Sequence, residues 1–138
     1  TPGGSIPFGV GDERWRATYR DRIDKMMEIG TEGGAHVAWV GLPIMGDARF
    51  SDNMHTLDGM FAREAEAHPD VLYLDTYEMF SKDGKYTDYL PNEQGNLQLV
   101  RAGDHTHFTA TGDRMVATEL LRMMKFRAGW HLSPKVRE

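Results

Sequence analysis

Residues 36–43, His-Val-Ala-Trp-Val-Gly-Leu-Pro, form a short and almost continuously apolar run that ends at a proline. A run of this length and composition is typical of a strand buried on both faces of a parallel sheet. A second such run covers residues 71–75 and follows a segment with helical spacing of its apolar residues. A strand, a helix and a second strand with short links predict a βαβ unit.

Three helices are predicted around these strands from apolar residues at helical spacing and from residues that favour helix ends. The first helix begins after Asp12 as N-cap and ends at Gly30, the second begins at Ser51 as N-cap and ends at residues 68–69, and the third covers residues 110–127. The residues expected to face the core are Trp15, Tyr19, Ile23, Met26 and Met27 in the first helix, Met54, Leu57, Phe61 and Ala65 in the second, and Val116, Leu120, Met123 and Met124 in the third.

The remaining segments contain glycine, proline and polar residues that favour turns. Residues 1–11 are expected to form a loop and residues 128–138 a polar tail. Turns are predicted at residues 83–84 and 95–96, and a short edge strand at residues 97–100. With 138 residues the chain is expected to form one domain, 1–138.

The composition narrows the classes of partner. The formal net charge is -5 and no basic patch is visible, so nucleic acid is not expected as a partner. No apolar run approaches the roughly 18 residues that a membrane-spanning helix requires. The absence of cysteine excludes disulfides and thiol chemistry.

The stretch Asp104-His105-Thr106-His107-Phe108-Thr109 carries the strongest chemical signal. An aspartate three residues before a histidine can accept a hydrogen bond from one ring nitrogen, which leaves the other nitrogen to face a substrate or nucleophile. The competing interpretation is a loop that ends in a helix cap at Thr109, with Asp104 and His107 merely solvated. Short motifs match often by chance, so the neighbouring segments must decide between the two interpretations.

Three stretches together resemble the SGNH, or GDSL-like, hydrolase superfamily, and most closely a bacterial branch known as a domain of unknown function. They are residues 104–112, residues 36–43, and residues 73–80 with 84–91. The resemblance implies a three-layer, flavodoxin-like α/β fold with a mainly parallel sheet. The blocks that carry the nucleophilic serine, and the glycine and asparagine of the oxyanion hole, are not found. The chain therefore resembles the C-terminal part of such a domain, with the N-terminal strands missing.

By this resemblance, His107 is the general base and Asp104 its orienting partner. The implied activity is hydrolysis or acyl transfer on a small acyl ester, such as an acetyl group on a cell-envelope carbohydrate, without a cofactor or a metal. Tyr86, Tyr89 and Arg101 are candidates to line the substrate cleft. The family branch implies a periplasmic or secreted protein. The missing N-terminal segment or self-association is expected to cover the open edge of the sheet.

Three alternatives stay open. Ser5 in Gly3-Gly4-Ser5 could stand in for the nucleophile, but no strand precedes it and Pro7 would break the helix expected after it. A zinc site could use His105 and His107 with Asp104 and His55. A non-catalytic module could bind glycans or proteins through the same cleft.

Overall fold

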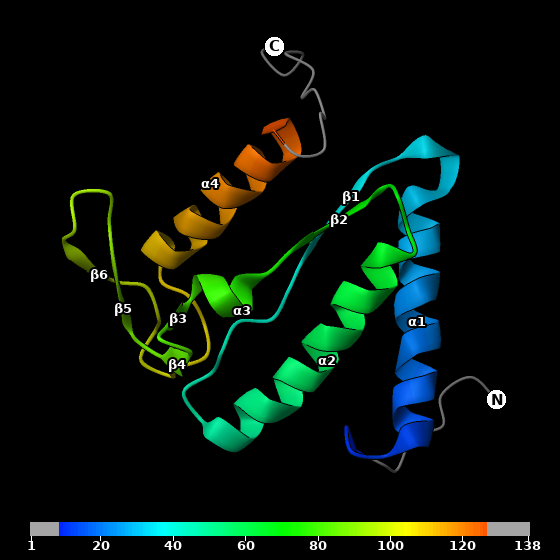
Figure 1. The fold of residues 1–138 in the computed structure, drawn as a ribbon, viewed down its shortest axis with the longest axis horizontal. Coiled ribbons are helices and arrows are strands. Elements are labelled where there is room, and N and C mark those ends of the chain that lie inside the picture. The colour runs from blue at the N-terminus through cyan, green and yellow to red at the C-terminus, as the bar shows by residue number, and fades with distance from the viewer. Residues whose placement is uncertain (1–8, 127–138) are drawn as a thin grey trace. The chain divides into compact units, whose positions relative to one another are not determined.

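The structure, a computed structural model, describes residues 9–126. These residues form a mixed α/β structure with four α-helices and three two-stranded sheets, one of them parallel (Figure 1). The described chain divides into two compact units, the first ending at residue 86 and the second beginning at residue 87. The α/β class expected from the sequence is confirmed, and the larger flavodoxin-like sheet stays a prediction. None of the helices within residues 9–126 is long and apolar enough to cross a membrane.

Helix α1 (Glu13–Thr31) opens the first unit and begins where the sequence predicts. The Asp12 side chain accepts hydrogen bonds from two backbone N–H groups of the first turn, so this residue is the N-cap as expected. Ile23 and Met27 are buried, as predicted, but 61% of Met26 is exposed. Met26 lies about 100° around the helix from Met27, because each residue advances the helix by that angle, and so it leaves the buried stripe.

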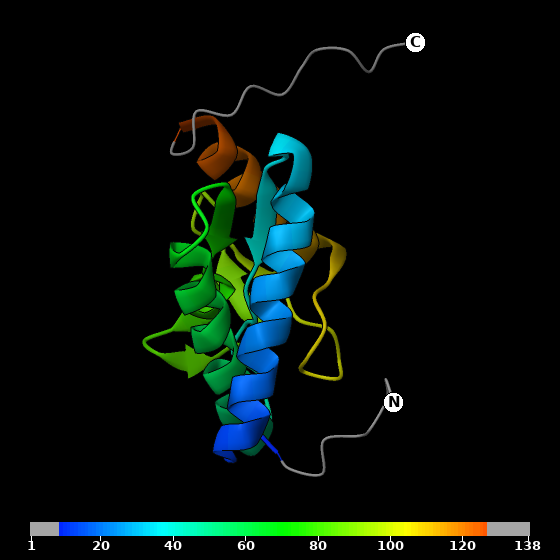
Figure 2. The ribbon, with the colours of Figure 1, turned by 90° about the vertical axis from the view of Figure 1, so that its right-hand side faces the viewer.

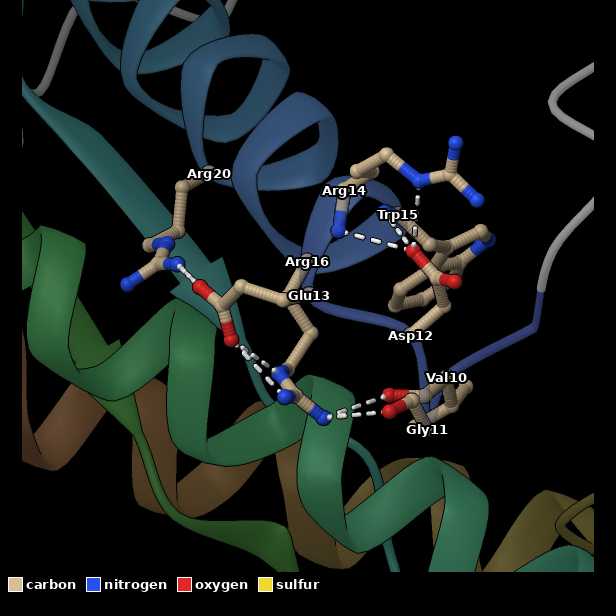
Figure 3. A network of polar contacts seen from close by, with 8 residues as sticks. All are labelled: Val10, Gly11, Asp12, Glu13, Arg14, Trp15, Arg16 and Arg20. Carbon is tan, nitrogen blue, oxygen red and sulfur yellow. Dashed lines mark hydrogen bonds and ion pairs between the residues drawn. The ribbon is translucent and has the colours of Figure 1, made fainter.

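A charged network surrounds the first turn of α1 (Figure 3). The Glu13 carboxylate accepts hydrogen bonds from Arg16 at 2.8 and 3.1 Å and from Arg20 at 2.6 Å. The Arg16 guanidinium also donates to the carbonyl oxygens of Val10 and Gly11, each at 3.1 Å. The hydrogen bond from Arg16 is the main reason why the pKa of Glu13 is lowered. Arg16 therefore ties the preceding turn to the helix.

Strands β1 (Val37–Val40) and β2 (Val71–Leu74) pair in parallel, with Val37 opposite Val71 and Val40 opposite Leu74. Helix α2 (Ala48–Glu66) connects them, which confirms the βαβ prediction. Helices α1 and α2 both pack beside these strands, as the two views show (Figures 1 and 2). The shared core consists of Ile23, Met27, Met60, Ala65 and Val71, with Trp15, Tyr19, Val37, Trp39, Leu57, Phe61 and Tyr73 packed against it.

The predicted start of the second helix was wrong. Asp47 is the N-cap, and its side chain accepts a hydrogen bond from the Phe50 N–H at 2.7 Å. Ser51 lies inside the helix and is buried, and its hydroxyl accepts a hydrogen bond from the Met45 N–H at 3.0 Å. Aspartate and serine are both good N-caps, and here the helix begins at Ala48, so Asp47 takes the role.

A buried carboxylate joins the carboxyl ends of β1 and β2 to α2. Asp58, 4% exposed, accepts hydrogen bonds from the Leu42 N–H and the Tyr73 hydroxyl, each at 2.8 Å. The Thr76 hydroxyl donates to the Gly41 carbonyl at 2.8 Å. Burial raises the pKa of Asp58, and the two hydrogen bonds oppose that shift. Polar contacts thus fix the point where the chain leaves β1.

The first unit also contains two short helices. The 3₁₀-helix η1 (Glu32–Gly34) directly follows α1, and α3 (Thr76–Met79) follows β2. Strands β3 (Ser81–Lys82) and β4 (Lys85–Tyr86) then form an antiparallel hairpin. The turn at residues 83–84, predicted from its Asp-Gly sequence, has positive φ angles of 53° and 71°. This conformation suits a two-residue hairpin turn.

The second unit contains the antiparallel strands β5 (Tyr89–Pro91) and β6 (Leu97–Leu99), followed by helix α4 (Ala110–Phe126). The short strand predicted at residues 97–100 and the last helix are confirmed. Met123 is buried, whereas the other residues of its predicted stripe, Val116, Leu120 and Met124, are half-buried. Ser5 and the predicted tail lie outside the described residues, and the single-domain prediction stays untested.

Two glycines provide a test of the packing at the end of β1. A Cβ atom at Gly41 would lie 2.7 Å from both the Asp58 carboxylate and the Tyr73 hydroxyl, whereas one at Gly59 in α2 would meet nothing within 4 Å. We expect Gly41→Ala to lower the free energy of unfolding by about 1–3 kcal/mol through overpacking. Gly59→Ala should raise it by about 0.5–1 kcal/mol through helix propensity. Urea denaturation of both variants measures this, and equal shifts of the same sign would contradict the described packing.

Candidate active site

The loop before α4 is closed by backbone hydrogen bonds. The Ala102 N–H donates to the His107 carbonyl at 2.8 Å, and the Thr109 N–H donates to the Val100 carbonyl at 3.0 Å. Arg101 and Phe108 form an isolated antiparallel bridge between them. The loop is therefore a hairpin-like turn whose two ends are held together.

Asp104 and His107 contact each other across this turn. The Asp104 Oδ2 atom lies 2.5 Å from His107 Nδ1. The Asp104 Oδ1 atom accepts hydrogen bonds from the Thr106 and His107 N–H groups, each at 3.0 Å. The hydrogen bond from the His107 ring, assisted by these two N–H groups, holds the pKa of Asp104 well below its ordinary value. The carboxylate is thus ionised and orients the imidazole.

The second ring nitrogen of His107, Nε2, is accessible. The His107 side chain is 80% exposed and that of Asp104 is 50% exposed. Within residues 87–126, Nδ1 has Asp104 as its partner and Nε2 has no hydrogen-bond partner. An ionised carboxylate can only accept a hydrogen bond, so Nδ1–H is the donor, and in the neutral ring Nε2 carries the lone pair. The pair can therefore take a proton from a group that approaches Nε2.

Thr109 fulfils the competing interpretation of the motif at the same time. Its hydroxyl accepts a hydrogen bond from the Gly112 N–H at 3.2 Å, as an N-cap does, and donates to the Leu99 carbonyl at 2.8 Å. A Cβ atom at Gly112 would overlap the Val100 carbonyl oxygen, so α4 packs directly on the end of the preceding segment. The motif is both a helix start and an Asp–His pair.

Arg101 supports the loop from within. It is 1% exposed, and its guanidinium donates to the Thr106 carbonyl at 2.6 Å and lies 5.0 Å from the centre of the Phe108 ring. A buried charge needs such partners. The sequence did not signal this supporting contact, and the proposed role of Arg101 in lining a cleft stays a prediction.

A second histidine–carboxylate contact in the loop was also missed. His105 lies with Nδ1 3.1 Å from Asp88 Oδ1, and 56% of its side chain is exposed. His55 belongs to the first unit, where its ring lies 4.1 Å from that of Tyr77. Among the described residues, no group of three histidine, aspartate or glutamate side chains is arranged to hold a metal ion.

The two tyrosine candidates lie in different units. Tyr86 ends β4 in the first unit and is half-buried. Tyr89 begins β5 in the second unit, opposite Leu99, and is exposed. Their common role in substrate binding stays a prediction.

A family model described as "Protein of unknown function (DUF459)" matches residues 3–123. This match includes both candidate catalytic residues and all three βαβ elements. No curated protein matches the chain.

The pKa of Asp104 provides a test of the pair. The folded-state pKa is lowered, so the contact stabilises the fold above the ordinary carboxyl pKa of about 3.9. That contribution is lost as pH falls through the lowered value. We expect the ¹³Cγ signal of Asp104, followed by NMR, to titrate below the ordinary value in the wild type and nearer to it in His107→Ala. An identical midpoint in both proteins would show that the ring does not hold the carboxylate.

Proposed function

The chain belongs to the DUF459 family, and on this premise we propose that it supplies the Asp–His part of an SGNH-type serine ester hydrolase or acyltransferase. The observation that carries the proposal is the contact between Asp104 and the Nδ1 atom of His107, with Nε2 left open. A carboxylate that fixes the imidazole in this way is the arrangement required of a general base that activates a hydroxyl.

In the proposed mechanism, His107 Nε2 accepts the proton of a serine hydroxyl while the serine oxygen attacks the ester carbonyl. The Asp104 carboxylate stabilises the imidazolium that forms. The imidazolium then gives its proton to the departing alcohol, which leaves an acyl-serine. Water or an acceptor alcohol then attacks this ester while His107 takes its proton, and His107 returns that proton to the departing serine oxygen, which restores the serine hydroxyl. The nucleophilic serine has not been identified in this chain.

The proposed substrate is a small acyl ester, such as an acetyl group on a cell-envelope carbohydrate. This choice, the periplasmic or secreted location and the larger flavodoxin-like sheet all follow from the family resemblance. Tyr86, Tyr89 and Arg101 are proposed to line the cleft. The exposed ring of Tyr89 supports its assignment best, because a sugar face can pack on an accessible aromatic ring.

The test is turnover of a chromogenic acetyl ester by this chain and by a longer protein that contains it. In the active protein, we expect His107→Ala to lower kcat/KM by several orders of magnitude, on the order of 10⁴-fold or more. Asp104→Ala should lower it less if water can replace the carboxylate.

His36→Ala is the matched control, because His36 also forms an exposed contact with an aspartate, Asp70, at 3.2 Å. It should keep wild-type activity. Full activity of His107→Ala would remove the assignment. If both the chain and the longer protein were inactive, a binding module would be favoured in place of an enzyme.

A further inference from the structure

The turn at His105 has a conformation that a side chain disfavours. Its φ angle is 57°, in the left-handed region that glycine fills most readily. The residue lies between Asp104 and His107, so this turn directs the next two N–H groups toward the Asp104 carboxylate. The chain places an imidazole at this position, and that imidazole contacts Asp88, seventeen residues earlier, at 3.1 Å.

Asp88 is itself anchored. Its carbonyl oxygen accepts a hydrogen bond from the Val100 N–H at 2.8 Å, directly before β5 begins at Tyr89. Its side chain is 30% exposed. The Val100 carbonyl in turn accepts the Thr109 N–H, which closes the loop at its other end. The contact between Asp88 and His105 therefore connects the tip of the loop to the backbone segments at residues 88 and 100, which hold the ends of the loop.

We propose that Asp88 and His105 are positioning residues for the Asp104–His107 pair, a role that rests on the proposed function. They act through the turn, and neither is required to touch the substrate. An exposed contact of this kind contributes little to global stability. A displacement of about 1 Å in a catalytic base, however, can lower the rate about 10²-fold. The contact should therefore matter more for turnover than for folding.

The first experiment measures kcat and KM for the acetyl ester in the active protein. His105→Gly removes the imidazole but accepts the positive φ, and Asp88→Ala removes the carboxylate. We expect each to lower kcat about 10²-fold with little change in KM. Asp88→Asn, whose carbonyl oxygen can still accept the ring N–H, should restore most of the rate. Asp70→Ala, which removes the partner of His36, is the matched control and should be neutral.

The second experiment does not depend on activity. The ¹⁵N signals of the His107 ring, recorded by NMR on the 138-residue chain, report its tautomer and the hydrogen bond at Nδ1. We expect His105→Gly and Asp88→Ala to weaken that signature while the thermal unfolding temperature stays near that of the wild type. Unchanged ring signals in both variants would overturn the proposal. If turnover survives His107→Ala, the proposed function fails, and the ring signals alone decide whether Asp88 and His105 hold the pair.

Discussion

The Asp104 carboxylate is the contact on which the candidate site depends. One oxygen accepts two backbone N–H groups and the other contacts the His107 ring, all within four residues of the chain. This requires the chain to turn sharply at His105, which adopts a left-handed conformation. The same carboxylate thus determines both the path of the loop and the direction of the imidazole. Without the carboxylate or without the turn at His105, His107 would be a solvated histidine in front of an ordinary helix.

The contact between Asp104 and His107 was predictable from the sequence because it is local. Asp104 and His107 are three residues apart, so a single bend brings them together. The βαβ unit was also predictable, because the apolar runs of β1 and β2 and the spacing in α2 each point to one type of element. Local preferences and the final fold agree in these segments.

The errors and omissions arise where two local solutions compete or where the contact is long-range. Asp47 and Ser51 are both suitable N-caps, and pattern alone did not decide between them. The contact between Asp88 and His105 joins residues seventeen positions apart. Arg101 was predicted to line a cleft, and the sequence did not indicate that its side chain is buried, because arginine is rarely buried without a specific set of partners. Such contacts depend on how the loop and the hairpin pack, which spacing does not reveal.

Two aspartates in this chain show why the chemistry is assigned to the loop. Burial raises the pKa of Asp58, and its two oxygens are occupied by the Leu42 N–H and the Tyr73 hydroxyl. A carboxylate in that position, 4% exposed, ties the strand ends to the helix. The imidazole lowers the pKa of Asp104, whose partner His107 presents its second nitrogen to solvent. Proton transfer to an external group requires an accessible nitrogen, and the proposed general base His107 has an accessible ring beside a carboxylate that can orient it.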